Sequence, residues 1–131
     1  GTNHRMGLHD MVLIKDNHLA ALHNEANPIG TAVARVREVC PELKIEVEAD
    51  TLKQTELAAA AGADIILLDN MAPEKLREAV QLVDGRSKLE ASGGITLTNI
   101  RPVAETGVDF ISVGALTHSP PAVDIALDFK A

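Results

Sequence analysis

Apolar and polar positions follow one another along this chain in a pattern that repeats several times. Four short apolar segments, at residues 44–50, 64–70, 88–94 and 109–115, each run into acidic residues, an Asp-Asn pair or a Ser/Gly cluster. Each segment is predicted to be a β-strand. The second contains four apolar residues in succession, from Ile65 to Leu68, which is typical of a strand buried on both faces of a parallel sheet. We therefore expect polar side chains to gather at the carboxyl ends of parallel strands.

A fifth strand and several helices complete this alternation. Met11–Ile14 is a short apolar run that is followed at once by polar residues. Apolar residues recur at helical spacing after Pro28, with Asn27 as the expected cap, and Thr51 is the expected cap of the next helix. The sequence predicts a loop with some helical character at 19–26. The other helices are predicted at residues 52–61, at 74–83, and from a cap at Thr96 or Thr98 through Glu105.

Strand and helix alternate often enough to predict the fold class. The phrases AGADII at 61–66 and ETGVDFI at 105–111 share one order, namely helix, glycine stop, aspartate and strand. This order is typical of a βα barrel, and the pattern contains five βα units. A closed barrel has eight strands and typically about 250 residues, whereas this chain has 131. We predict an α/β fold with parallel strands, a partial TIM-like barrel in one domain over residues 1–131. Either the chain is a fragment, or another chain supplies the missing strands, or the sheet stays open.

Charge and composition argue against two classes of partner. The formal net charge is −7, whereas nucleic-acid binding requires a basic surface, and the aromatic residues are limited to Phe110 and Phe129. No apolar run approaches the roughly 20 residues of a membrane span. Cys40 is the single cysteine and cannot form an internal disulfide. We therefore predict a cytoplasmic protein with neither nucleic acid nor a membrane as partner.

Ser92, Gly93 and Gly94 form the first candidate binding element. Glycines after a strand allow backbone N–H groups to approach an anion closely, and the start of a following helix adds partial positive charge. Gly114 ends the next predicted strand and can complete the cradle. Barrel enzymes often hold phosphate on loops in such a place. The alternative is a glycine turn that serves only as a tight connection.

Glu48 and Asp69 are candidate catalytic residues because they stand at the ends of neighbouring predicted strands. Carboxylates in such a place are typical of a site for Mg²⁺ or for a polyhydroxylated ligand. The alternatives are an internal salt bridge from Glu48 to Lys15 and a helix-capping role for Asp69. Glu46 and Glu90 are also expected to face into the packed sheet, where an internal structural role is open to them.

His4, Arg5 and Lys15 form a basic cluster in an otherwise acidic chain. Arginine binds carboxylates through paired hydrogen bonds and lysine adds a point charge, so the cluster predicts a pocket for an anion. A solvated terminus is the alternative for His4 and Arg5. Two other functions stay open from the residues alone. One is a Schiff-base aldolase of a phosphosugar with Lys15 as nucleophile, and the other is a non-catalytic half-barrel that binds phosphate.

Several segments, taken together and in order, resemble one enzyme family. They are NHRMGL at 3–8, MVLIKDNH at 11–18, IEVE at 45–48, ILLDNM at 66–71, LEASGGI at 89–95 and TGVDFISVGALTHS at 106–119. The set resembles the quinolinate phosphoribosyltransferases, also called carboxylating nicotinate-nucleotide pyrophosphorylases, over essentially the whole chain. The resemblance implies that quinolinate and phosphoribosyl pyrophosphate give nicotinate mononucleotide, pyrophosphate and carbon dioxide in the de novo synthesis of NAD. It also implies a Mg²⁺ requirement and a homodimer or higher homo-oligomer.

The resemblance further implies a role for each candidate residue. His4, Arg5 and Lys15 match residues that bind the two carboxylates of quinolinate. Glu48 and Asp69 match acidic residues that face the ribose, the pyrophosphate and, directly or indirectly, Mg²⁺. Together with Lys15 they are the expected catalytic residues. The residues that match the loops holding the 5′-phosphate are Ser92, Gly93, Gly94, Gly114 and Ala115.

Two features of the family have no counterpart in the sequence. Family members carry an N-terminal α/β domain and an Arg-Lys-Thr motif on an early barrel strand, and neither occurs in these 131 residues. In the family dimer, the N-terminal domain of the other subunit also contributes an arginine to the quinolinate pocket. We therefore expect a fragment of a longer enzyme, the C-terminal part of a barrel domain, that is inactive or nearly so when it is alone.

Overall fold

Five parallel strands form one sheet in the computed structural model, which describes residues 11–22 and 24–114. The strands follow one another in space in the order of the chain. Their bounds are Met11–Ile14 (β1), Lys44–Ala49 (β2), Ile65–Asp69 (β3), Lys88–Ser92 (β4) and Phe110–Ile111 (β5). The helices are Asp16–Ala20 (α1), Pro28–Val39 (α2), Leu52–Ala60 (α3), Pro73–Val83 (α4) and Ile100–Ala104 (α5). This arrangement confirms the predicted α/β fold with a parallel sheet.

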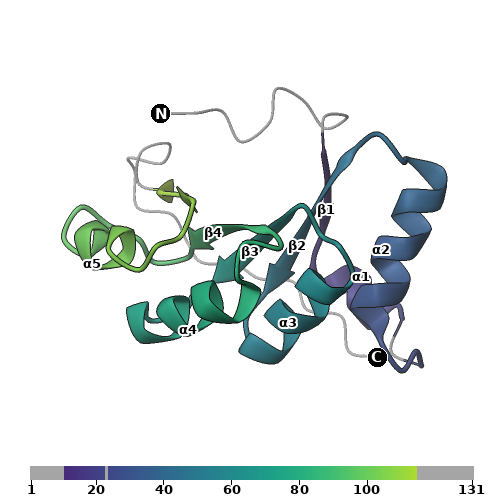
Figure 1. Ribbon diagram of the computed structural model, residues 1–131, viewed down its shortest axis with the longest axis horizontal. Coiled ribbons are helices and arrows are strands. Elements are labelled where there is room, and N and C mark those ends of the chain that lie inside the picture. Colours follow the sequence, from purple (N-terminus) through teal and green to yellow (C-terminus); the bar gives the residue numbers. More distant parts are fainter. Residues whose placement is uncertain (1–10, 23, 115–131) are drawn as a thin grey trace.

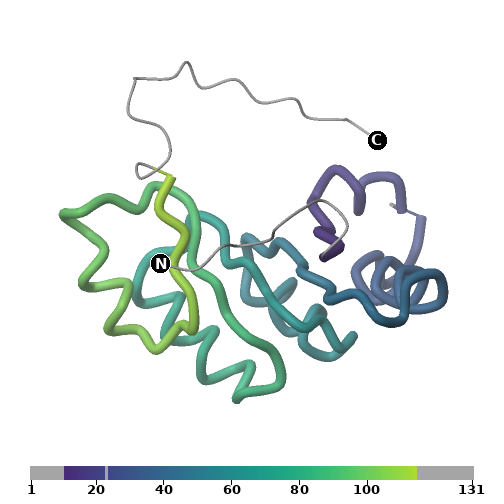
Figure 2. The backbone as a smooth tube through the Cα atoms, turned by 90° about the horizontal axis from the view of Figure 1, so that it is seen from above, coloured from purple at the N-terminus to yellow at the C-terminus, as the bar shows by residue number. Residues whose placement is uncertain are grey.

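The helices α2 to α5 lie along one face of the sheet (Figure 1). Consecutive parallel strands that are joined by right-handed crossovers place their connecting helices on a common face. Seen from above, the backbone follows a curved path in which each βα unit lies beside the next (Figure 2). A curved parallel sheet with its helices outside is the arrangement of one part of a βα barrel.

The hydrophobic core lies between the sheet and these helices. Alternate residues of the central strands, such as Val47, Ile66 and Leu89, belong to it. Val33 of α2 and Leu76 of α4 contribute from the helical side, and each is 1% exposed. The register pairs Val47 with Ile66 and Ile66 with Leu89, so the apolar residues form continuous rows across the sheet. The residues between them along each strand project from the opposite face.

The longer helices begin where the sequence predicts. The side-chain oxygens of Asn27 and Thr51 accept hydrogen bonds from the N–H groups of Gly30 and Gln54, so both residues cap their helices. Pro73 occupies the first turn of α4. A backbone N–H at that position has no acceptor within the helix, so the absence of an N–H in proline costs no hydrogen bond. Of the helices in the described part of the chain, none has the length and apolar character that a membrane crossing needs.

Short elements depart most from the prediction. A helix, α1, begins directly after β1, where the His18 Nδ1 atom accepts a hydrogen bond from the Lys15 N–H. It ends at Ala20, within the segment 19–26 for which the sequence predicts a loop with some helical character. Similarly, α5 begins at Ile100 with Asn99 before it, and not after a cap at Thr96 or Thr98. In the turn that precedes the helix, the Thr96 N–H donates to the Asn99 side chain. In the described part of the chain, β5 has two residues, and Phe110 and Ile111 pair with Glu90 and Ala91 of β4.

Two aspartates tie the amino ends of neighbouring strands together. The Asp64 carboxylate, just before β3, accepts a hydrogen bond from the Ile45 N–H of β2 at 2.8 Å. The Asp109 carboxylate, just before β5, accepts bonds from the Leu89 N–H of β4 at 2.9 Å and from Lys88 at 2.6 Å. We call these contacts the aspartate clasps. In the repeated order of glycine, aspartate and strand, the aspartate therefore joins its strand to the preceding one at the amino edge of the sheet.

Candidate functional site

Lys15 and Glu48 meet at the carboxyl edge of the sheet. Lys15 follows the last residue of β1, and the register that pairs Ile14 with Val47 brings the two residues after them side by side. The Lys15 Nζ atom is 3.5 Å from the Glu48 Oε2 atom. The Lys15 side chain is 52% exposed and that of Glu48 is 19% exposed, so a ligand can reach both. The salt bridge that the sequence leaves open as an alternative is therefore present, but at an accessible place.

Glu48 belongs to an electrostatic cluster with two further carboxylates. Burial raises the pKa of Glu48 above its ordinary value of 4.5, and the negative charges of Asp69 and Asp16 raise it further. The Lys15 ammonium group opposes these effects. We call Lys15, Asp16, Glu48 and Asp69 the acidic cluster. It combines three carboxyl groups with one ammonium group, an imbalance that favours a cation or a ligand that develops positive charge.

The turn after β4 is built against the turn after β3. The Asn70 N–H donates a hydrogen bond to the Ser92 carbonyl oxygen at 2.9 Å. Gly93 has a φ of +83°, and a Cβ atom at this position would lie 2.8 Å from the Asn70 nitrogen and 3.0 Å from the Asp69 Oδ1 atom. Any side chain at position 93 would therefore collide with the neighbouring turn. This close approach holds the turn at residues 92–94 against the acidic cluster.

The N–H groups of Gly93 and Gly94 are available to a ligand. Both residues are exposed, and within residues 11–22 and 24–114 neither N–H donates to a protein acceptor. Successive backbone N–H groups without protein acceptors suit an anion such as a phosphate. A cavity of about 380 Å³ adjoins this turn, and its lining includes Asn70, Leu76, Gly93, Gly94, Asn99 and Val103.

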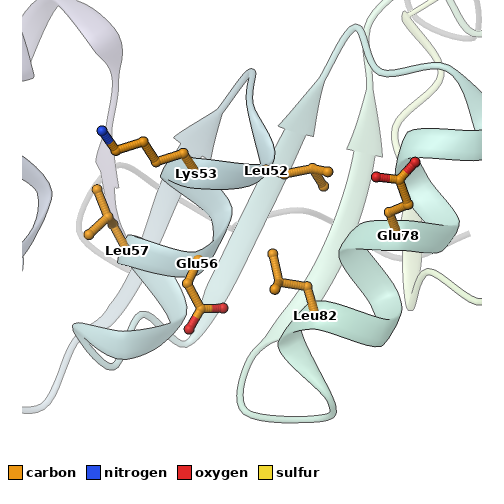
Figure 3. A pocket seen from close by; sticks show the side chains of 6 residues that line it. All are labelled: Leu52, Lys53, Glu56, Leu57, Glu78 and Leu82. Atoms are coloured by element: carbon orange, nitrogen blue, oxygen red, sulfur yellow. The ribbon is translucent and has the colours of Figure 1, made fainter.

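A second hollow lies on the outer, helical side of the molecule. It has a volume of about 440 Å³ and lies between α3 and α4, where Leu52 and Leu82 border the space between the two helices (Figure 3). Its other lining residues are Lys53, Glu56, Leu57 and Glu78. The hollow shares no residue with the acidic cluster or with the turn at 92–94, so it is separate from the candidate site.

Similarity to known proteins identifies the family of this chain. The family model described as "Quinolinate phosphoribosyl transferase, C-terminal domain" matches residues 1–128. The chain belongs to this family. The nicotinate-nucleotide pyrophosphorylase (carboxylating) of Mycobacterium leprae is 47% identical over 131 residues, which cover 98% of this chain and 45% of that protein. The probable nicotinate-nucleotide pyrophosphorylase (carboxylating) of Bacillus subtilis is 44% identical over 129 residues, with coverage of 98% and 43%.

A solved quinolinate phosphoribosyltransferase family structure agrees with this assignment. The nicotinate-nucleotide pyrophosphorylase from Francisella tularensis superposes with a TM-score of 0.81 and 44% identity, over 89% of this chain and 40% of that chain. A structure described as an aldolase has a TM-score of 0.64 at 24% identity, a likeness that shows the fold alone. The chain spans less than half the length of the curated relatives it matches.

The structure brings together most of the site residues that the sequence predicts for this chain. Lys15, Glu48 and Asp69 belong to one cluster, and the turn at 92–94 packs against Asp69. Gly114 follows β5, whose carboxyl end lies at the same edge of the parallel sheet. Three predicted site residues lie outside the described residues, namely His4, Arg5 and Ala115.

Glu46 and Glu90 differ from Glu48 in their burial. Glu46 is 0% exposed and Glu90 is 4% exposed, so a ligand at the edge of the sheet does not reach them directly. The Ser112 hydroxyl donates a hydrogen bond to the Glu90 carboxylate, which links β4 to the residue after β5. The burial of both residues and the contact of Glu90 fit the internal structural role that the sequence leaves open for them.

Three residues of this region are not singled out by the sequence pattern. Asp16 contributes to the raised pKa of Glu48, and its one signal is its place directly after Lys15. Asn70 fixes the turn after β4 from the preceding loop, and its signal is its place at a strand end. The Asn99 side chain donates a hydrogen bond to the Gly94 carbonyl oxygen, and only the folded backbone reveals that contact.

Proposed function

We propose that this chain takes part in phosphoribosyl transfer to quinolinate. The ring nitrogen of quinolinate attacks C1 of phosphoribosyl pyrophosphate, pyrophosphate leaves, and loss of carbon dioxide gives nicotinate mononucleotide. The observation that carries the proposal is the Lys15–Glu48 pair beside Asp69, next to a turn with two available N–H groups. Because the chain spans 43% and 45% of two curated relatives, we propose that it forms part of the complete active site.

Lys15 is proposed to hold quinolinate, which carries two carboxylates. Its side chain is half exposed, and its ammonium group lies 3.5 Å from the Glu48 carboxylate. A fixed cation next to the acidic cluster directs the dianion so that its ring nitrogen faces the sugar, and such positioning supplies much of the catalytic effect. His4 and Arg5 are proposed partners of Lys15 because of the family resemblance.

Glu48 and Asp69 are proposed to stabilise the transition state. Departure of pyrophosphate leaves positive charge on the ribose ring at C1 and its ring oxygen. Carboxylates that already stand next to developing positive charge stabilise it without reorganisation. The mutual repulsion of these carboxylates contributes to the raised pKa of Glu48 and is relieved when that charge develops.

The same two carboxylates fit a Mg²⁺ ion that is shared with the substrate. Mg²⁺ usually keeps several waters and is bound through one or two carboxylates together with substrate phosphates. Within the described residues, no group of three or more His, Cys, Asp or Glu residues could hold a metal. Glu48 and Asp69 are therefore proposed to hold Mg²⁺ jointly with the pyrophosphate group. Bound Mg²⁺ would neutralise charge on the leaving group.

The turn at 92–94 is proposed to hold the 5′-phosphate. The N–H groups of Gly93 and Gly94 lack protein acceptors in the described part of the chain, and Gly114 stands at the end of the adjacent strand. Decarboxylation needs no protein nucleophile, because the electron pair of the breaking C–C bond enters the quaternised pyridinium ring and a proton from water replaces carbon dioxide. A homodimer or higher homo-oligomer stays a prediction from the resemblance, and a cytoplasmic location stays a prediction from the composition of the sequence.

Release of labelled carbon dioxide from the 2-carboxyl of quinolinate tests the proposal in the full polypeptide that carries this chain. Glu48→Gln is expected to lower kcat by about 100-fold or more, because a neutral amide cannot stabilise the charge on the ribose. Asp50→Asn is the matched control, since it removes an exposed carboxylate from the same end of β2. Release that does not depend on phosphoribosyl pyrophosphate, or an equal loss in both variants, contradicts the proposal.

Two further measurements apply to the chain itself. Calorimetric titration with phosphoribosyl pyrophosphate and with quinolinate is expected to show saturable binding of at least one of them, and binding of neither would leave only a structural role. Borohydride trapping with a phosphosugar aldehyde addresses the aldolase alternative. We expect no adduct, because Lys15 is half exposed and paired with a carboxylate, whereas Schiff-base lysines are activated by burial or by a neighbouring cation.

A further inference from the structure

We propose that Asn99 is a positioning residue that sets the shape of the phosphate-binding turn at residues 92–94. This inference rests on the proposed function, because it takes the turn to be the site of the 5′-phosphate. Asn99 lies beyond the turn, directly before α5. Its role is therefore exerted through the backbone of the turn and requires no contact with the ligand.

The Asn99 side chain binds the backbone at two points of the loop. Its Nδ2 atom donates to the Gly94 carbonyl oxygen at 2.9 Å, and its Oδ1 atom accepts from the Thr96 N–H at 2.8 Å. The Thr96 carbonyl oxygen in turn accepts from the N–H groups of Asn99 at 3.3 Å and Ile100 at 3.0 Å. One side chain therefore closes the loop that joins the turn to α5.

The usual role of an asparagine at this position is absent. An asparagine before a helix typically caps it by accepting a hydrogen bond from an N–H two or three residues further on. Asn99 is the residue before α5, but its side chain makes no such bond. Asn27 does cap α2 in this way, through the Gly30 N–H at 3.0 Å. The hydrogen-bonding capacity of Asn99 is directed back to the loop instead.

The turn has a particular need for such a support. Gly93 and Gly94 have φ values of +83° and +59°. Glycine adopts this left-handed conformation without strain, but it also adopts many others, so glycine alone does not fix the shape of the turn. The Asn70 N–H fixes the Ser92 side of the turn at 2.9 Å, and Asn99 fixes the Gly94 side. With both sides held, the two N–H groups are ordered before an anion arrives, and the entropy cost of binding falls.

The affinity for ribose 5-phosphate, measured by calorimetric titration, tests this inference. Asn99→Ala is expected to weaken binding about tenfold, because the glycine turn must then be ordered on binding. Asn99→Asp keeps an acceptor for the Thr96 N–H but loses the donor to Gly94, so it is also expected to bind more weakly. Asn27→Ala is the matched control, because it removes a helix-capping asparagine from another βα unit.

A second readout separates positioning from general destabilisation. The amide NMR shifts of Gly93 and Gly94 are expected to respond to ribose 5-phosphate in the unaltered chain and in Asn27→Ala, but only weakly in Asn99→Ala. Binding by Asn99→Ala within about twofold of the unaltered chain, or equal losses in Asn99→Ala and Asn27→Ala, would overturn the inference. Failure of the unaltered chain to bind ribose 5-phosphate would instead remove the phosphate site itself, and with it that part of the proposed function.

Discussion

At the scale of single residues, Gly93 is subject to two separate constraints. Its φ of +83° lies in the left-handed region, and a Cβ atom there would lie 2.8 Å from the Asn70 nitrogen. Gly62 is subject to the first constraint alone, since its φ is +80° and an added Cβ would meet nothing within 4 Å. A comparison of the two positions therefore separates backbone strain from steric collision.

Gly93→Ala is expected to destabilise the chain more than Gly62→Ala. Each substitution costs about 1–2 kcal/mol for the left-handed backbone. Gly93→Ala adds about 1–3 kcal/mol, because the neighbouring turn must move to admit the methyl group. Urea denaturation of both variants measures the difference, and equal losses of unfolding free energy would show that the close approach to Asn70 is unimportant.

Removal of the Lys15 charge is expected to raise the pKa of Glu48 further. Burial, Asp69 and Asp16 all raise this pKa, and the Lys15 ammonium is the opposing charge. Lys15→Met keeps the length of the side chain while it removes the charge. A ¹³C NMR titration of the Glu48 carboxyl provides the measurement. Lys53→Met, at an exposed position of α3, is the control and is expected to leave the pKa unchanged.

The sequence identifies some of these residues and not others for a physical reason. Lys15, Glu48 and Asp69 can be predicted, because the end of an apolar strand and its alternation are visible in the sequence, and parallel strands bring such ends together. Asn99 cannot be predicted, because an asparagine before a helix normally indicates a cap. Its actual contact with Gly94 depends on the path of the loop, which side-chain patterns do not encode locally.

At the scale of elements, the clasp formed by Asp109 makes the stability of the sheet depend on pH. Burial opposes the ionisation of Asp109, but hydrogen bonds from Lys88 and from the Leu89 N–H outweigh it and hold the pKa of Asp109 below its ordinary value of 3.8. A carboxyl group with a lowered pKa stabilises the fold above its unfolded-state pKa. That stabilisation is lost as the pH falls through the folded-state pKa.

Asp109→Asn is therefore expected to lower the unfolding free energy near neutral pH and to have less effect in acid. The difference from the unaltered chain should shrink as the pH falls below 3.8, because protonated Asp109 then resembles the asparagine. Urea denaturation over a range of pH measures this difference. Asp50→Asn, at an exposed position, is the control. A difference that stays constant from neutral to acid pH would show that the clasp does not depend on the Asp109 charge.

Elements are predictable in proportion to their length and to the local signals at their ends. The helices α2, α3 and α4 combine helical periodicity with Asn27, Thr51 or Pro73 at the start, so several local signals agree. By contrast, α1 and α5 have five residues each, too few to display a period. Their boundaries are set by local hydrogen bonds, such as the bond from the Thr96 N–H to Asn99.

At the scale of the whole molecule, spatial order repeats chain order. Every strand pair joins consecutive strands, so β2, β3 and β4 have a strand on each side. Within the described residues, β1 pairs only with β2, and β5 pairs only with β4. Local stability is expected to fall from the centre of the sheet to its edges, because an edge strand opens with the loss of one neighbour.

Hydrogen exchange is expected to reveal this gradient. Amides of β3 should be the most protected and those of β5 the least, because β5 has two residues and, among the described strands, pairs with β4 alone. Mass spectrometry of peptides that contain residues 65–69 or residues 110–111 measures the rate of deuterium uptake in each strand. Equal protection of β3 and β5 would mean that the sheet opens only as one cooperative unit.

The position of the aspartate clasps has a consequence for how such a chain can evolve. Asp64 and Asp109 join strands at the amino edge, whereas the acidic cluster and the turn at 92–94 stand at the carboxyl edge. The two sets share no residue, so substitutions that adapt the carboxyl edge to another ligand leave the clasps intact. Selection can thus alter chemistry and preserve folding by acting on different residues, and an engineer who wishes to change the ligand can confine a library to one rim of the sheet.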